Sequence, residues 1–349
     1  MKAIQKLSAL VQERGLEGDY SDLGAIYTKL SPEKDLILFN YSPLAMVENT
    51  WNGYEQICRG LALNSKGEIV ALPFKKFFNF GQMGYDADYI NRVGIEYLTE
   101  KMDGSLGILY YYNDQWNIIT RGSFDSDQSK KAYELLAKYD LSKLMTDATY
   151  LLEIIYPENR VVLSYNREFL CLLAVIDNKN GYEYDFAMCQ ITAEETGFDL
   201  PQLYPPVPLP ELIRMQSEVM GGMEGWVATL NNGERVKFKT QEYLALHRAA
   251  NNISFKNILN LMYDQKPDDI IALFPDEFRL EVTAMVEDIQ LRVQVLSNAA
   301  QCAFKGLYNP DRRTFALSIK DLPGKRLLFL LYDNRDIREA CLDMVKDGI

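Results

Sequence analysis

The segment EKMDGSLG, residues 100–107, places Lys101 two residues before an Asp-Gly-Ser turn. A neutral lysine amine is a nucleophile that can form a covalent intermediate. A free lysine has a pKa near ~10.4, so a site that used Lys101 in this way would have to lower that pKa by burial or nearby cations. The alternative is a solvated lysine beside an ordinary hairpin turn, which Asp-Gly commonly indicates. Lys101 is therefore a candidate nucleophile, and the residues around it must decide between these two roles.

Two further lysines alternate with apolar residues in ERVKFKT, residues 234–240. Successive side chains of a strand point to opposite faces, so Lys237 and Lys239 share one face, and Val236 and Phe238 share the other. Two cations beside a buried face could bind a polyphosphate. The alternative is a solvated strand face.

Two glutamates stand where a carboxylate is unusual. Glu153 lies inside the apolar run YLLEIIY, where a lone carboxylate is costly unless it is paired or binds a ligand. An arginine such as Arg160 could instead satisfy it within the core. Glu224 begins MEGWVATL, the strand that precedes the lysine strand across an Asn-Asn-Gly turn. Both are candidate metal or ribose ligands.

Three more cations precede or follow Lys101 in strand-like segments. Arg59 lies in ICRGLAL, Lys76 in PFKKFFNF and Arg121 in IITRGSF. Each alone could be a surface charge, and the segment around Lys76 could be a strand that packs Phe77 and Phe78 into the core.

These residues need strands to position them, and residues 1–240 contain many. Runs rich in β-branched and aromatic residues, bounded by turn signals, predict strands, and YYYNDQWN and ATLNNGERV predict hairpin turns. The apolar spacing of residues 127–140 predicts a helix, and the Pro-rich residues 200–210 predict a loop without regular structure. The predicted strands are EIVALPF, LGILYYY, QWNIITRG, TYLLEIIY, RVVLSY, FLCLLAVID, EGWVATL and ERVKFKT.

Beyond residue 241 the pattern becomes helical, most clearly in residues 254–265, 276–306 and 336–348. We therefore predict an α+β fold with an N-terminal domain at 1–245 and an all-helical domain at 246–349.

Composition narrows the classes of function. The chain has 349 residues, a net charge of −12, one histidine and five cysteines. Nucleic acid would have to bind at a local basic patch, because a nonspecific coating protein is normally basic. A single histidine makes His-based triads and His-rich metal sites improbable. The scattered cysteines favour an intracellular protein, and an amphipathic N-terminus and short apolar runs predict neither a signal peptide nor a membrane segment. We separately expect a cytoplasmic monomer in a bacterial or phage-infected host cell.

Taken together and in order, seven blocks resemble the nucleotidyltransferase superfamily of covalent ligases and capping enzymes. Within it, the chain resembles the phage-type ATP-dependent RNA ligases that repair tRNA, the RNA ligase 1 class. DRRTFALSIK, residues 311–320, resembles the helical C-terminal domain of that class. The seven blocks are CRGLAL, PFKKFFNF, EKMDGSLG, TRGSFDSDQ, LLEIIYPENRVVLSY, MEGWVATL and RVKFKTQEYLALH.

The resemblance implies an N-terminal domain of ATP-grasp-like antiparallel sheets in which Lys101 attacks the α-phosphate of ATP. AMP would then pass to an RNA 5′-phosphate, and a 3′-hydroxyl would displace it. Asp103 and Gly104 would let the nucleotide approach the backbone, and Lys237 and Lys239 would neutralise the α-phosphate.

The remaining roles follow from the same resemblance. The β- and γ-phosphates or the ribose would contact Arg59 and Lys76, with Arg121 in the same pocket. Glu153 and Glu224 would bind ribose hydroxyls and a hydrated Mg²⁺, with Mn²⁺ as an alternative. The implied partners are RNA ends, tRNA among them, and the helical domain would bind the RNA. Many relatives carry an aromatic residue beside the glutamate where this chain has Leu152 and Ile154, so the residue that stacks on adenine is open.

Two other functions remain open from the sequence. A DNA ligase or an RNA guanylyltransferase would share the superfamily, although those enzymes usually have a β-barrel after the lysine strand. A catalytically silent RNA-end-binding protein could keep the fold, but it would be expected to lose Lys101, Glu224 or the 237/239 lysines, and all are present.

Overall fold

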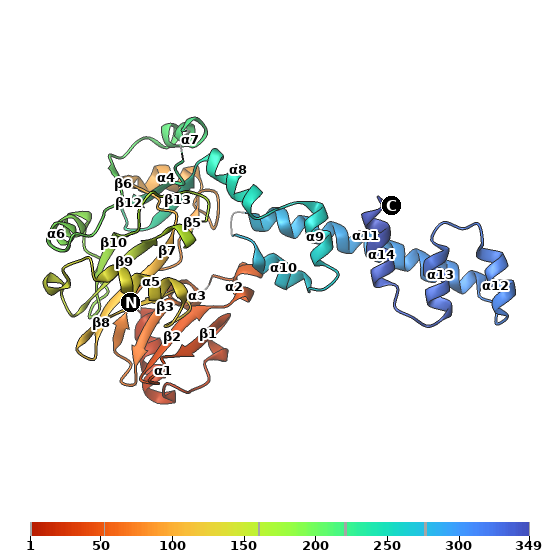
Figure 1. Cartoon of the computed structure of the whole chain (residues 1–349), viewed down its shortest axis with the longest axis horizontal. Coiled ribbons are helices and arrows are strands. Elements are labelled where there is room, and N and C mark those ends of the chain that lie inside the picture. The colour runs from red at the N-terminus through yellow and green to blue at the C-terminus, as the bar shows by residue number, and fades with distance from the viewer. Residues whose placement is uncertain (1, 52, 160, 220–221, 276–277, 349) are drawn as a thin grey trace. The chain divides into compact units, whose positions relative to one another are not determined.

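The computed structural model describes residues 2–51, 53–159, 161–219, 222–275 and 278–348. The chain forms two compact units, Met1–Ala250 and Asn251–Ile349. The first unit combines three sheets with helices, and the described part of the second is helical (Figure 1). The predicted α+β class is therefore confirmed.

The first sheet has the antiparallel order β1-β2-β3-β4. Helix α1 (Lys2–Arg14) packs Ile4, Leu7 and Val11 into the same core as this sheet. Every residue of β2 is buried, which matches its apolar sequence except at Asn40, a buried polar residue. The strands are β1 (Ile26–Leu30), β2 (Leu36–Tyr41), β3 (Arg59–Asn64) and β4 (Ile69–Ala71), and the short helices between β2 and β3 are α2 (Pro43–Val47) and α3 (Gly53–Ile57).

The second sheet has the order β10-β9-β7-β8. The hairpin predicted at YYYNDQWN joins β7 to β8, and Asn113 and Asp114 both have positive φ, as a two-residue type I′ turn requires. The helix predicted at 127–140 ends earlier, at Leu136. The elements are β7 (Ser105–Tyr112), β8 (Gln115–Thr120), α5 (Asp127–Leu136), β9 (Ala148–Ile155), β10 (Phe169–Asp177) and α6 (Phe186–Thr196).

The strand predicted at RVVLSY was wrong for residues 161–165, which form no regular element. The backbone N–H groups of Val162 and Leu163 donate to the side chain of Asp103 instead of to a strand. The buried Asp103 carboxylate therefore accepts backbone N–H groups for which the apolar pattern predicted partners in a sheet.

The third sheet, order β11-β6-β12-β13-β5, carries the lysine strand. All its pairs are antiparallel except β13 with β5. Residues 200–210 were predicted to lack regular structure, but Leu203 and Tyr204 pair with β6. These two residues keep the backbone N–H groups that the prolines around them lack, so they can join the sheet. The elements are β5 (Phe78–Asn79), α4 (Ala87–Val93), β6 (Ile95–Glu100), β11 (Leu203–Tyr204), α7 (Leu209–Glu218), β12 (Gly225–Leu230), β13 (Arg235–Lys239) and α8 (Gln241–Ala250).

The second unit packs short helices along the 29-residue α11. Two small cores form, one around Leu327 and Cys341 and one around Phe315 and Leu328. Among the described residues, no helix has both the length and the apolar character needed to cross a bilayer. The helices are α9 (Phe255–Leu261), α10 (Pro267–Leu273), α11 (Arg279–Leu307), α12 (Arg312–Ile319), α13 (Lys325–Tyr332) and α14 (Arg338–Lys346).

Candidate active site

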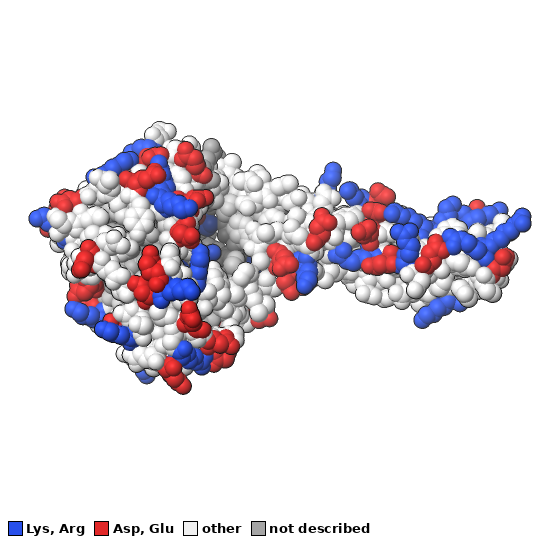
Figure 2. Space-filling model, turned by 60° about the horizontal axis from the view of Figure 1, so that its bottom comes forward, with Lys and Arg blue, Asp and Glu red and all other residues white. Residues whose placement is uncertain are grey.

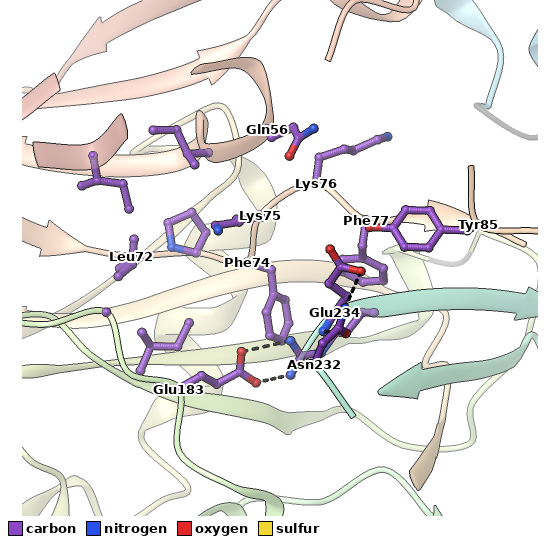
Figure 3. A pocket seen from close by; sticks show the side chains of 17 residues that line it. Gln56, Leu72, Phe74, Lys75, Lys76, Phe77, Tyr85, Glu183, Asn232 and Glu234 are labelled. Atoms are coloured by element: carbon purple, nitrogen blue, oxygen red, sulfur yellow. Dashed lines mark hydrogen bonds and ion pairs between the residues drawn. The ribbon is translucent and has the colours of Figure 1, made fainter. Parts of the chain in front are cut away.

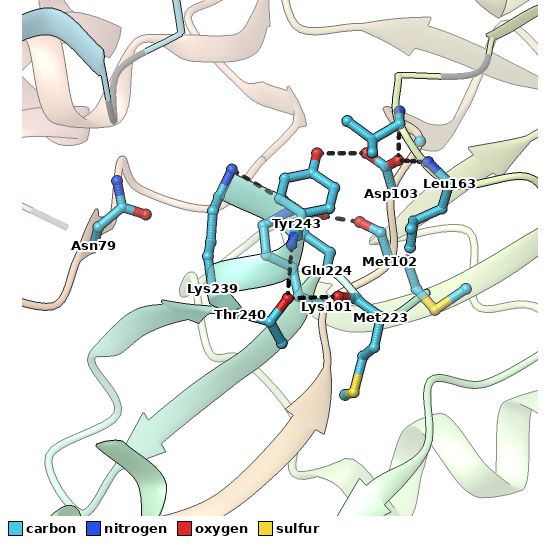
Figure 4. Close-up of polar contacts among 12 residues, drawn as sticks. Asn79, Lys101, Met102, Asp103, Leu163, Met223, Glu224, Lys239, Thr240 and Tyr243 are labelled. Carbon is cyan, nitrogen blue, oxygen red and sulfur yellow. Dashed lines mark hydrogen bonds and ion pairs between the residues drawn. The ribbon is translucent and has the colours of Figure 1, made fainter. Parts of the chain in front are cut away.

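Lys101, Glu224 and Lys239 meet at one end of the third sheet (Figure 4). Lys101 follows the end of β6, Glu224 precedes β12, and Lys239 ends β13. One carboxylate oxygen of Glu224 lies 2.7 Å from Lys101 Nζ, and the other lies 3.0 Å from Lys239 Nζ. Glu224 is 1% exposed, so two ammonium groups compensate a carboxylate that water hardly reaches.

Gly225 brings the three strands together at this point. Its φ is +144°, and a Cβ there would lie 2.0 Å from the carbonyl oxygen of Phe238. The carbonyl of Gly225 also accepts the backbone N–H of Lys101 at 2.9 Å. Only glycine allows this close approach, which places Glu224 beside Lys101.

Asp103 stabilises the loop after Lys101. Its carboxylate accepts the N–H groups of Val162 and Leu163 at 2.9 and 2.7 Å and the hydroxyl of Tyr243 at 2.8 Å. The side chain is buried, and Figure 4 shows these partners around it. Asp103 thus connects the loop after Lys101 to helix α8 and to the segment after β9. A direct contact between Asp103 and a nucleotide stays a prediction.

Gly104 and Glu153 are joined directly. The N–H of Gly104 donates to Glu153 Oε1 at 3.1 Å, and a Cβ on Gly104 would lie 2.6 Å from the carbonyl oxygen of Ile154. Burial raises the pKa of Glu153 to about 7; the cation Lys101 opposes that rise, and Glu224 adds to it. The alternative partner Arg160 lies outside the described residues.

A cavity of about 220 Å³ opens beside these groups. Arg59, Lys101, Gly104, Glu153 and Lys237 contribute to its wall. Burial lowers the pKa of Lys237 well below its usual value, and repulsion from neighbouring cations lowers it further. These cations are Lys76, Lys101, Arg59 and Lys239.

The rest of this cavity is mainly apolar, which suits a purine ring. Leu152 and Ile154 are fully buried in the core beneath β9, because the strand's alternation that turns Glu153 toward the cavity turns them away. Leu152 and Ile154 thus face away from the cavity, and the residue that stacks on adenine stays open. The apolar lining comes from Phe74, Phe77, Met102, Leu106, Leu173, Pro201 and Val227.

Lys76 and Arg121 belong to a neighbouring cluster around Tyr41. The Lys76 amine lies 4.9 Å from the centre of the Trp51 ring and 5.5 Å from that of Tyr41. The Arg121 guanidinium lies 4.9 Å from the Tyr41 ring and donates to the Tyr41 hydroxyl. Neither contributes to the wall of the 220 Å³ cavity, in contrast to Arg59. The predicted site residues thus form two adjoining groups.

Two aromatic side chains that contact the candidate site residues were not among the residues predicted for the site. Phe77 faces both Lys237 and Arg59, with ring centres 4.9 and 5.9 Å from their charged groups. Tyr243 packs 5.0 Å from the Lys239 amine and holds Asp103. The Phe-Phe-Asn sequence after Lys76 and the tyrosine four residues after Lys239 were the available signals, but their apolar character indicated core packing.

A metal ion would depend on few protein ligands. Among the described residues, no cluster of three or more histidine, cysteine, aspartate or glutamate side chains could hold one. Glu153 lines the cavity with Lys101, and Glu224 contacts Lys101. A Mg²⁺ that keeps several waters and uses substrate phosphates needs only one or two such carboxylates. The donor set therefore fits a hydrated divalent ion bound together with a nucleotide.

Comparison with known proteins identifies the family of the chain. Residues 57–243 match the model of a protein family described as RNA ligase. The RNA ligase of Rhodothermus phage RM378 is 25% identical over 386 residues, covering 86% of this chain and 85% of that protein. RNA ligase 1 of bacteriophage TS2126 is 27% identical over 323 residues, covering 81% and 77%. A solved archaeal ATP-dependent RNA ligase has a similar fold, with 15% identity, a TM-score of 0.52, and coverage of 83% of this chain and 82% of that one.

Proposed function

The chain belongs to the RNA ligase family of enzymes, and we propose that it joins RNA 5′-phosphate and 3′-hydroxyl ends with consumption of ATP. The observation that carries this proposal is the contact of Lys101 and Lys239 with one buried glutamate, beside a cavity lined by Lys237, Arg59 and Glu153. A nucleophile, phosphate-binding cations and metal-binding carboxylates are the groups that nucleotidyl transfer needs.

In the first step, Lys101 Nζ attacks the α-phosphorus of ATP while the bond to pyrophosphate breaks. The amine must first leave Glu224 and release a proton to solvent, because an ammonium group has no free electron pair. We assign Lys237 and Lys239 to the α-phosphate, where they would stabilise the charge that develops. Arg59, Lys76 and Arg121 hold the departing pyrophosphate.

In the second step, an oxygen of the RNA 5′-phosphate attacks the same phosphorus, the bond to Lys101 breaks, and the amine takes up a proton. In the third, the 3′-hydroxyl of another RNA end attacks the activated phosphate, AMP leaves, and the hydroxyl proton is released. The chain supplies mainly positioning and charge neutralisation for all three transfers.

A hydrated Mg²⁺, or Mn²⁺, would be held by Glu153 and Glu224 through direct or water-mediated contacts. Such an ion would supply additional positive charge at the phosphates. Glu153 must be ionised to contribute, so its pKa of about 7 makes metal binding sensitive to pH in the neutral range.

The helical second unit is proposed to bind the RNA. Figure 2 shows Lys and Arg side chains gathered where this unit carries α12 and α13. Arg312 and Arg326 pair with Asp333 and Asp343, which reduces the positive charge that these two arginines offer to phosphate. Lys305 and Arg313 are exposed, and within the described chain no carboxylate pairs with either. The physiological role proposed is repair of cleaved RNA, tRNA among the candidates.

The test is incubation with α-labelled ATP and Mg²⁺, followed by denaturing electrophoresis. We expect an acid-labile covalent label from ATP and little from GTP, and sealing of RNA ends in preference to DNA ends. A GTP preference would indicate a guanylyltransferase, and wild-type protein that takes no label would overturn the proposal.

A further inference from the structure

A second cavity, of about 390 Å³, adjoins the first in the same unit (Figure 3). The two share part of their walls, namely Phe74, Phe77 and Arg235. Figure 3 shows the two phenylalanine rings extending from the segment before β5 toward Glu183 and Glu234. A volume in this range accommodates a nucleotide-sized ligand.

The shared wall is held rigidly. The Arg235 guanidinium makes two hydrogen bonds to Glu183, one of 2.9 Å, and lies 4.3 Å from the centre of the Phe74 ring. Phe74 and Phe77 meet edge to face with ring centres 5.9 Å apart. Phe74 is only 7% exposed, so the less buried Phe77 presents most of the aromatic surface for stacking, at little cost in conformational entropy.

The charged side chains of the second cavity carry a net positive formal charge, with Lys75, Lys76 and Arg235 against Glu183 and Glu234. Glu183 is engaged by Arg235, and Glu234 accepts from the Tyr89 hydroxyl and, at 3.0 Å, from Asn232. Lys75 contributes to the wall and is exposed, and no carboxylate of the described chain pairs with its amine. In a protein of net charge −12, a free cation beside aromatic rings favours an anionic aromatic ligand.

We propose that this second cavity binds the terminal nucleotide of an RNA strand, with a phosphate at Lys75 and the base against the Phe74–Phe77 wall. The inference rests on the proposed ligase function, whose last two steps require RNA ends beside the adenylate. Phe77 lies between the cavities and faces Lys237 and Arg59, so a nucleotide on its other side would be next to the phosphate-binding cations. Stacking on aromatic residues with a phosphate contact is how proteins commonly hold single-stranded ends.

Lys76, which is proposed to hold pyrophosphate, also lines this cavity, whereas Lys101, Glu153, Glu224, Lys237 and Lys239 are absent from its wall. A change confined to Lys75 can therefore perturb the cavity while the first step is left intact. Both the 5′-phosphate donor strand and the 3′-hydroxyl acceptor strand end in a nucleotide of this chemistry, and separate kinetics for each strand distinguish them.

The experiment uses the full chain with Lys75→Glu, the conservative Lys75→Arg and the matched control Lys66→Glu. Lys66 is exposed in the β3–β4 turn, outside both cavities, and undergoes the same change of charge. Two rates are measured: lysyl-AMP formation from labelled ATP, and sealing of a pre-adenylated donor RNA to an acceptor RNA with each strand varied in turn.

We expect Lys75→Glu to label within about twofold of wild type and to raise the KM for one strand by at least roughly tenfold. Lys75→Arg should restore that KM, Lys66→Glu should not change it, and the strand affected identifies the occupant. Unchanged sealing kinetics would overturn the inference, as would a matching loss of labelling, which would assign the cavity to ATP. Failure of the wild type itself to label would instead overturn the proposed function.

Discussion

The carboxylate of Glu224 lies 2.7 Å from the amine of Lys101, although 123 residues separate the two in sequence. Its other oxygen lies 3.0 Å from the Lys239 amine, so one buried carboxylate pairs with two lysines. In the proposed adenylylation, Lys101 would have to exchange this carboxylate partner for a phosphate.

Lys101→Ala should abolish covalent labelling by ATP, because the substitution removes the amine that would attack the α-phosphorus in the first step. The variant should still seal RNA that is supplied already 5′-adenylylated, at least weakly, since the third step needs no lysine nucleophile. Gel assays of both reactions check this. Label that persists at another residue would refute the assignment of Lys101.

Glu224→Ala should reduce adenylylation by at least roughly tenfold, which corresponds to about 1.4 kcal/mol in the transition state. The substitution also leaves Lys101 and Lys239 without the carboxylate they share, so the melting temperature should fall. Single-turnover labelling below the melting transition separates the two effects. Normal labelling would make Glu224 a structural residue.

Glu153→Ala should likewise reduce adenylylation by at least roughly tenfold, and Glu153→Gln should change how stability depends on pH. The folded protein raises the pKa of Glu153 from 4.5 to about 7, so it binds this proton more tightly than the unfolded chain does. The resulting stabilisation is fully present below about pH 4.5 and is lost as pH rises through about 7.

Between these pH values, the wild type should therefore lose unfolding free energy relative to Glu153→Gln. Denaturant titrations of both proteins at several pH values measure the difference. Parallel curves would show that the Glu153 proton is held no more tightly in the folded protein.

Lys237→Met and Lys239→Met should both lose labelling, yet they should change stability in opposite directions. Lys237 is a cation disfavoured by burial and by its neighbours, so its removal should raise the melting temperature near pH 7. Lys239 pairs with Glu224, so its removal should lower it. Thermal melts by circular dichroism provide the comparison. If a variant folds and labels fully, the lysine that it lacks has no role at the α-phosphate.

Reversing Lys305 and Arg313 to Glu together should leave lysyl-AMP formation intact and weaken RNA sealing. Phosphate contacts release counterions, so RNA affinity should also fall less steeply from 50 to 200 mM salt than in the wild type. Lys66→Glu is the charge control. Arg312→Glu is less informative, because it would place a glutamate against Asp333. Equal loss of both reactions would indicate a role in stability.

The amino-acid sequence by itself determined which residues could carry the chemistry and much of the sheet framework. The alternation of ERVKFKT places Val236 and Phe238 in the core and turns Lys237 and Lys239 the other way, because side-chain direction in a strand follows from local geometry. The Asn113–Asp114 hairpin and the helical character beyond residue 250 are also local, since turn dihedrals and apolar spacing encode them.

Only the tertiary structure decided how those residues are partnered, because burial and pairing depend on segments far apart in the chain. It made residues 161–165, which were predicted as part of a strand, a loop held by Asp103, and it placed Lys76 and Arg121 in a cluster around Tyr41. It gave Arg312 and Arg326 acidic partners that lie 21 and 17 residues further along the chain. It also brought Glu224 to Lys101 and crowded cations around Lys237, since the field at a side chain is the sum over every element packed against it.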